Sequence, residues 1–244
     1  PSMDALYAAA HLGFAFWKPA RLRRLLRMWL RNYTGELRAL ALALQSQAER
    51  KLGGMEAYLP LIAECEVLCK DLSRLPREQA LIEAAHCCCF DDPAMALRLI
   101  EGVSRKPAKA ARYLCDARML LVRAECEFVA IRIEESFALV QQARDALPHR
   151  AGRVHRARIE AEIEVRHMVC HSMLRFFKVD SELLLQPVRA IEEQHGCAGD
   201  ILRGAIVNDY LMRMRTWEVG LMTPEQINFV LAEARPDNLR GYLI

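Results

Sequence analysis

Hydrophobic residues recur along almost the whole chain every three to four positions, which is the spacing of an α-helix with one buried face. This pattern predicts twelve helices, separated by short segments that contain Gly, Pro or helix-capping residues. We expect them at residues 4–16, 20–32, 35–51, 55–72, 76–89, 92–103, 107–128, 131–147, 151–177, 180–195, 199–218 and 223–235. The starts at Asp92-Pro93 and Thr223-Pro224 are the clearest, because a capping residue precedes a proline at the first helical position.

Helices of this length joined by short loops are expected to form antiparallel pairs that stack on one another. One pair alone cannot cover its apolar face, whereas stacked pairs share a continuous core. The order therefore predicts an all-α fold, a right-handed α-solenoid of about six antiparallel helical hairpins. We expect residues 1–33 to form an N-terminal capping hairpin and residues 34–244 to form one continuous helical-repeat domain.

Three segments can be superposed at the start of the second helix of a pair. In each, a small residue is followed four positions later by an aliphatic one: Ala57 and Leu61, Ala96 and Ile100, Ser136 and Val140. The small residue lets the paired helix approach closely, and the aliphatic residue one turn later completes the contact. The chain therefore carries a repeat with a period of about 40 residues.

This repeat resembles a degenerate tetratricopeptide repeat. The best match covers residues 124–148, where small Ala124 and Ser136 are followed by Val140 and Ala143 at the spacing of that family. It departs from the family pattern at Glu127, where an aromatic residue is usual, in lacking the Trp-Leu-Gly-Tyr signature, and in its longer period.

The resemblance covers about residues 35–236. Longer, irregular repeats of this kind are similar to the helical-repeat sensor regions of bacterial regulators, including LuxR-type ATP-dependent activators. The resemblance implies a regulatory role, in signalling or in transcription regulation. The start at Pro1-Ser2 before Met3 and the end at Gly241–Ile244 lead us to expect a segment of a longer protein.

Composition agrees with a helical, soluble chain. The 53% of hydrophobic residues supply a core, and the 11 Gly and 10 Pro are too few for a β-sandwich or a collagen-like chain. The longest stretch without a charged residue, residues 5–17, is shorter than the ~20 residues that span a bilayer. The nine cysteines are an odd number without a CxxC motif, as expected for reduced thiols packed in a core. We expect a cytoplasmic protein with no membrane span.

The net charge of +3 is too balanced for a dedicated nucleic-acid binder. One basic amphipathic helix, residues 21–31, nevertheless has an apolar stripe and, away from it, four arginines: Arg23, Arg24, Arg27 and Arg31. Such a helix could contact a membrane surface, a nucleic acid or a calmodulin-like partner. A capping hairpin with a solvated arginine face requires the same pattern, and we favour that interpretation.

Five further arginines fall on first helices of the predicted pairs: Arg112, Arg118, Arg123, Arg166 and Arg213. The resemblance to the tetratricopeptide repeat places Arg118, and approximately Arg166, on the concave groove. Arginines lining a groove would suit an acidic peptide, a carboxylate terminus or a phosphorylated effector. By contrast, the basic residues of 144–158 are followed by glutamates, so we expect pairs such as Arg158–Glu162 along an exposed helix.

The sequence offers little for catalysis or metal binding. His167, Cys170 and His171 share one helical face, but no fourth zinc ligand stands at a fixed spacing. We find no G-x-S-x-G motif, no glycine-rich phosphate loop and no local Cys–His frame. We therefore predict no catalytic residue, no metal, no cofactor and no enzymatic activity.

These patterns favour a non-catalytic module that recognises a protein or peptide partner, as the regulatory part of a larger bacterial regulatory protein. One alternative is a sensor domain of a transcriptional regulator that binds a small-molecule effector between its repeats. Another is a nucleic-acid accessory domain that uses residues 21–31. A homodimer is compatible with each of these.

Overall fold

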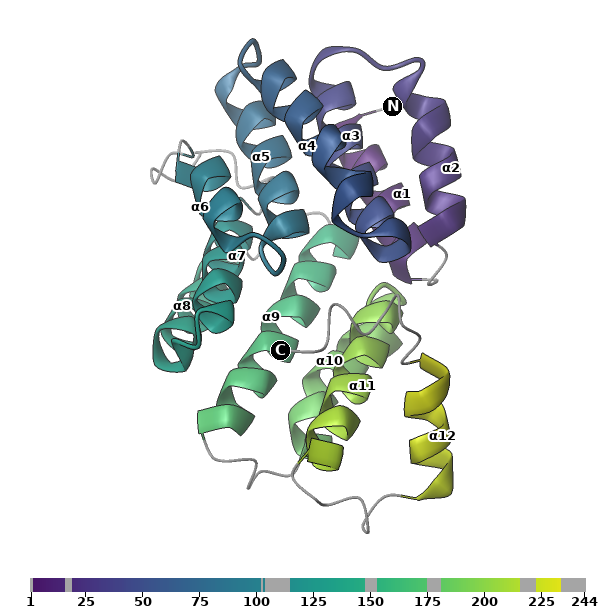
Figure 1. Cartoon of the computed structure of the whole chain (residues 1–244), viewed down its shortest axis with the longest axis vertical. Helices are drawn as coiled ribbons and strands as arrows, with labels where there is room; N and C mark the ends of the chain where they lie inside the picture. Colours follow the sequence, from purple (N-terminus) through teal and green to yellow (C-terminus); the bar gives the residue numbers. More distant parts are fainter. Residues whose placement is uncertain are drawn as a thin grey trace.

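The computed structural model of the chain describes residues 2–15, 19–101, 103, 115–147, 153–174, 181–215 and 223–233. Within these ranges the chain forms helices and turns, without a strand (Figure 1). The helices are α1 (Met3–Ala15), α2 (Pro19–Leu30), α3 (Gly35–Gly53), α4 (Met55–Cys69), α5 (Arg74–Cys88), α6 (Pro93–Glu101), α7 (Cys115–Val129), α8 (Ile133–Asp145), α9 (Arg153–Leu174), α10 (Ser181–His195), α11 (Gly199–Arg215) and α12 (Pro224–Glu233). Each predicted helix has its counterpart, which confirms the all-α prediction. Residues 107–114 of one predicted helix lie outside the described residues.

Local capping groups decide where several helices begin and end. At the start of α6 the carboxylate of Asp92 accepts a hydrogen bond from the backbone N–H of Met95 at 2.9 Å. At the start of α12, Thr223 and Gln226 exchange side chain–backbone hydrogen bonds, as in a capping box. Gly196 follows the last residue of α10 with φ +60°, a left-handed conformation that glycine adopts without strain.

The helices pack as two sets that alternate along the chain. The odd-numbered helices, α1 to α11, contact one another in sequence order, and α1 also contacts α9 and α11, so that they form a closed circuit. Each even-numbered helix packs mainly against the odd-numbered helices beside it in the sequence. Ten of the 19 residues of α3 are buried, against four of the 15 of α4. We call the odd-numbered helices inner and the even-numbered helices outer; inner helix α9 runs through the middle of Figure 1.

Apolar side chains fill the space between inner and outer helices. The largest cluster joins α3 to α7, and smaller clusters join α1 to α3, α7 to α9, and α9 to α11. The small and aliphatic residues of the predicted repeat contribute here: Ala96, Ile100, Ser136 and Val140 are buried, and Ala57 is half-buried. The 40-residue pattern therefore corresponds to a packing pattern between neighbouring helices.

Buried polar side chains follow the same division of the helices. Among the described residues, eleven of the twelve buried polar or charged side chains belong to inner helices, and Ser136 of α8 is the exception. Inner helices thus carry nearly all of the buried polar side chains of the described residues, and one of these, Glu49 of α3, pairs with arginines of outer helix α2.

The cysteines behave as small core residues. All nine are free thiols, and eight of them are buried. Burial raises the pKa of Cys87 and of Cys88 to about 12, so both stay protonated at neutral pH. In the part of the chain that the structure describes, no helix has both the length and the apolar content needed to cross a membrane.

Candidate functional site

Three inner helices are joined where cationic side chains of two of them bind one carboxylate of the third. Both terminal nitrogens of Arg158, on α9, donate to the carboxylate of Asp200, on α11, at 2.7 and 2.8 Å. The Nζ of Lys51, on α3, lies 3.2 Å from the same carboxylate. Burial alone would raise the pKa of Asp200, but attraction to Arg158 and Lys51 lowers it well below its usual range. Asp200 is therefore a buried carboxylate anion.

Arg118, on α7, continues this set of contacts toward α5. Its guanidinium pairs with Glu162 of α9 and lies 3.3 Å from Oε2 of Glu83 and 3.0 Å from Nδ1 of His86. Glu162 in turn lies 3.8 Å from Nε of Arg158, which joins the two groups of ion pairs. Because arginine can only donate, Nδ1 of His86 accepts and the ring proton is on Nε2. Arg118 is only 3% exposed.

Glu125 and Arg166 extend the contacts to the far side of His86. Glu125 lies 3.7 Å from His86 Nε2 and 3.7 Å from a terminal nitrogen of Arg166, and it accepts a hydrogen bond from the thiol of Cys89 at 2.9 Å. The guanidinium of Arg166 stacks over Phe128, 4.4 Å from the ring centroid. These contacts make up what we call the central ion network: Lys51, Glu83, Arg118, Glu125, Arg158, Glu162, Arg166 and Asp200. Its four cations balance its four carboxylates, as buried charges require.

Neutral histidines adjoin the network. The rings of Tyr7 and His11, on α1, stack on His155 of α9, with centroids 4.3 and 4.9 Å away. Burial, reinforced by repulsion from Arg118 and Arg158, lowers the pKa of His155 to about 4. Burial likewise lowers the pKa values of His11 and His86 well below the usual range. All three rings are therefore uncharged at neutral pH.

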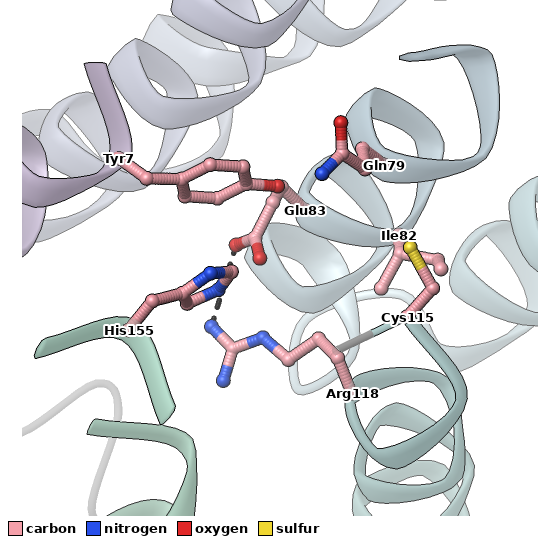
Figure 2. Close-up of a pocket in the computed structure, with 7 residues that line it drawn as sticks. All are labelled: Tyr7, Gln79, Ile82, Glu83, Cys115, Arg118 and His155. Atoms are coloured by element: carbon pink, nitrogen blue, oxygen red, sulfur yellow. Dashed lines mark hydrogen bonds and ion pairs between the residues drawn. The ribbon is translucent and has the colours of Figure 1, made fainter. Parts of the chain in front are cut away.

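A small pocket opens beside Arg118, between α1, α5, α7 and α9 (Figure 2). It is lined by Tyr7, Gln79, Ile82, Glu83, Cys115, Arg118 and His155. The space left between these side chains is about that of one water molecule. The side-chain nitrogen of Gln79, which is 3% exposed, finds no hydrogen-bond partner among the described residues. The pocket can therefore satisfy one further hydrogen-bond acceptor.

The pocket brings together Cys115 and His155, which lie far apart in the sequence. Burial and the nearby carboxylates of Glu78 and Glu83 raise the pKa of Cys115 to about 12. A nucleophilic cysteine needs the opposite shift, because the thiolate is the reactive form. The site holds Cys115 as a thiol next to an uncharged imidazole.

The predicted histidine–cysteine face on α9 is occupied by packing contacts. Cys170 lies 3.4 Å from the hydroxyl of Ser136, and the ring of His167 lies 5.2 Å from that of Phe137. Within the described ranges no group of three or more His, Cys, Asp or Glu residues is arranged to hold a metal ion.

The structure brings two of the five predicted groove arginines together. Arg118 and Arg166 lie on inner helices and both belong to the central ion network, where carboxylates of the same chain neutralise them. Arg123 lies half-buried on α7. Arg213 is on α11, but its side chain is outside the described part, as is the whole of Arg112.

The basic helix α2 packs its apolar stripe against neighbouring helices. Leu22 and Leu26 of α2 are buried against α1 and α3. Two of its arginines pair with one buried carboxylate of α3: Arg23 and Arg27 lie 3.4 and 2.9 Å from Glu49. The other two, Arg24 and Arg31, are exposed to solvent.

Sequence analysis missed three of the four carboxylates of the network, Glu83, Glu125 and Asp200. Arg118 and Glu125 are seven positions apart on one face of α7. This spacing can be read from the sequence and indicates that the two charged residues share a helix face. Lys51 and Asp200 are 149 positions apart, and no local pattern connects them. The prediction of an exposed helix at residues 151–177 was wrong for Arg158. Its pair with Glu162 does form, but Arg158 is 5% exposed, because α9 packs between α1, α7, α8, α10 and α11.

Comparison with known proteins finds no matching family model, no matching curated protein and no matching solved structure. The resemblance to the tetratricopeptide repeat thus depends on the packing residues of this sequence.

Proposed function

We propose that the chain is a non-catalytic helical-repeat module that binds a protein partner, as the regulatory part of a larger bacterial regulatory protein. In this proposal the helix pairs stack as a tetratricopeptide-like right-handed solenoid. The observation that carries it is that nearly all buried polar side chains of the described residues gather on the inner helices, which contact one another in sequence order. Helical-repeat proteins present their inner helices as the binding surface.

The chemistry of the inner faces supports binding rather than catalysis. Cys115 stays a protonated thiol, and His155 is an uncharged ring whose pKa is too low for a general base that works at pH 7. Arg118 and Arg166, two of the arginines expected to line an anion-binding groove, already contact carboxylates of the chain. An acidic peptide would have to compete with those internal carboxylates. A partner that binds through apolar and aromatic contacts would not, so we favour that class of partner.

A small-molecule effector is the second candidate, and the pocket beside Arg118 favours it. Gln79 offers an unused donor there, and Tyr7 and His155 offer aromatic faces (Figure 2). Because the present space holds about one water molecule, an effector would have to separate α1 from α9. Such an effector would raise the melting temperature of the chain, since it binds only the folded state.

The experiment is a pull-down of the tagged chain from a lysate of the source organism, washed first at low and then at high salt. A discrete protein that survives the high-salt wash is the expected result. The matched control is Arg24→Glu with Arg31→Glu, which removes exposed basic charge from α2 and leaves the pairs with Glu49 intact. Nucleic acid that elutes with salt and disappears in the control variant would contradict the proposal.

A further inference from the structure

Helix α1 docks on other helices through a single face. Its buried residues are spaced at i, i+3, i+4, i+7, i+8 and i+11: Met3, Leu6, Tyr7, Ala10, His11 and Phe14. Leu12 lies away from this face and is 37% exposed. Besides its neighbour α2, the helix contacts α3, α9 and α11, and so completes the circuit of inner helices. An amphipathic helix in a groove has this pattern of anchors.

Two aromatic anchors seven positions apart hold α1 in place. The Phe14 ring contacts two cations, with its centroid 5.0 Å from the Lys51 ammonium and 5.7 Å from the Arg158 guanidinium. The Tyr7 ring stacks on His155 at 4.3 Å. These contacts depend on aromatic faces rather than on ion pairs. Any helix with aromatic residues at these two positions can make them.

The walls of the groove are joined to each other without α1. Arg158 of α9 and Lys51 of α3, the two cations that contact Phe14, meet on the carboxylate of Asp200 of α11. Arg158 also donates to the backbone carbonyl of Cys197 at 3.0 Å, just before α11. Because these bonds connect the three walls directly, we expect the groove to keep its shape when α1 leaves it.

One residue in the buried face of α1 lacks hydrogen-bond partners for its side chain in the described part of the chain. His11 is 2% exposed, and neither of its ring nitrogens has a hydrogen-bond partner among the residues that the structure describes. A buried polar group without a partner opposes docking. A helix with an apolar residue in this position would bind the same groove more tightly. The chain therefore holds α1 as an occupant that another helix can displace.

From these contacts we infer that α3, α9 and α11 form a helix-binding groove, and that an amphipathic helix of the partner protein binds there in place of α1. The partner helix carries aromatic residues seven positions apart and an apolar residue four positions after the first of them. The inference rests on the proposed function, because it names the kind of partner that the module recognises.

The test uses a fluorescent peptide of residues 2–15 and the full chain, with binding measured by fluorescence anisotropy. Tyr7→Ala with Phe14→Ala weakens docking of the chain's own α1 and frees the groove, so this variant should bind the peptide at least about tenfold more tightly than the unmodified chain. His11→Leu strengthens docking of α1, so this variant should bind the peptide more weakly than the unmodified chain. The two variants thus shift the affinity in opposite directions.

Matched peptides check the contacts. A peptide with Phe14→Ala should lose binding, one with the exposed-position change Leu12→Ala should bind like the original, and one with His11→Leu should bind more tightly. Circular dichroism verifies that each chain is folded. If the double variant does not fold, the His11→Leu peptide is titrated into the unmodified chain and into the His11→Leu chain. Weaker binding to the His11→Leu chain supports the inference, and equal binding to the two chains contradicts it.

Equal affinity for all folded chains, or no binding to the folded double variant, would overturn the inference. Dimers that appear in size-exclusion chromatography and disappear with Phe14→Ala would show that the occupant is α1 of a second copy, which also contradicts it. One further outcome is a partner, captured from lysate, that binds all of these variants with the same affinity. That result would contradict the inference about the groove but not the proposed function.

Discussion

Arg118 shows how one side chain can join several elements of this protein. Its guanidinium contacts Glu83, His86 and Glu162, which belong to two other inner helices, and it is almost fully buried. A planar guanidinium with five donors can serve several acceptors at once, which an ammonium group cannot do in the same geometry. Removing it would leave the buried carboxylate of Glu83 without the cation that it pairs with, and would leave Glu162 with only Arg158 beside it among the described residues.

We therefore expect Arg118→Met to lower the free energy of unfolding by about 3–5 kcal/mol, because breaking a buried ion pair leaves an uncompensated charge. Urea denaturation followed by circular dichroism measures the change. Arg24→Met, at an exposed position of α2, is the control and should change stability by less than about 0.5 kcal/mol. Equal stability of the two variants would show that water replaces the guanidinium.

His155 makes stability depend on pH. Its pKa is about 4 in the folded chain, below the ~6.5 of an unfolded chain, so the unfolded chain binds the extra proton between these values. The stabilisation is complete above pH 6.5 and is lost as the pH falls toward 4. We expect His155 to contribute a loss of about 2 kcal/mol between pH 7.5 and pH 5, with His11 and His86 acting in the same direction.

Urea midpoints at pH 7.5, 6.5, 5.5 and 5 measure this dependence. The stability of His155→Gln should fall less steeply with decreasing pH than that of the unmodified chain. The difference between the two slopes gives the contribution of the His155 imidazole apart from that of the carboxylates. Identical slopes would mean that His155 titrates alike in the folded and the unfolded chain.

Among the helices, α7 ends with an unusual residue. Arg132 N–H bonds to the carbonyl of Glu127 and Ile131 N–H to that of Phe128, which is a Schellman motif. Ile131 occupies the left-handed position of this motif, with φ 62°, and its side chain is 76% exposed. Glycine is the usual residue there, because a β-branched side chain crowds the backbone in this conformation.

Ile131→Gly should therefore stabilise the chain by about 1 kcal/mol, as relief of backbone strain exceeds the entropy that glycine adds to the unfolded state. The melting temperature measured by calorimetry should rise. Ile131→Ala keeps a Cβ in the left-handed conformation, so we expect it to gain less. If alanine and glycine stabilise equally, the effect comes from removing an exposed apolar side chain and the backbone explanation fails.

Over the whole molecule, the contacts of α9 connect early and late parts of the chain. Through Arg158, Asp200 and Lys51, residues of α3, α9 and α11 share one cluster of charges. The apolar clusters, by contrast, join helices that are close in the sequence. The closed circuit of inner helices therefore depends on polar contacts more than the pairing of neighbours does.

A double-mutant cycle tests this dependence. Asp200→Ala and Arg158→Met should each destabilise the chain by about 3 kcal/mol, and the double variant should cost at least about 1 kcal/mol less than the two single effects together, because the second change removes a charge already left unpaired. Urea denaturation of the four chains gives the coupling. Additive effects would show that the two residues act independently.

The helices and several of their boundaries follow from the sequence by itself. Asp92, Thr223 and Gly196 act within one turn of the backbone, and the apolar spacing repeats within each helix, so both can be recognised in a short window. The same holds for packing between neighbouring helices, where Ala96 and Ser136 lie buried as their small size predicts. It also holds for α2, whose apolar stripe packs and whose arginines Arg24 and Arg31 stay in water.

Only the tertiary structure decided what the groove arginines contact and where α1 lies. Placing Arg118 and Arg166 on inner helices needed a helix register, which turns a side chain by about 100° for each residue of error. Pairing them with Glu83, Glu162 and Glu125 needed the packing of helices far apart in the sequence. Carboxylates such as Glu83 and Asp200 carry no local sign of the distant cation they will meet, and an apolar helix carries none of the groove it will fill. Both are settled when the inner helices close on one another, because only then do distant residues come within bonding distance.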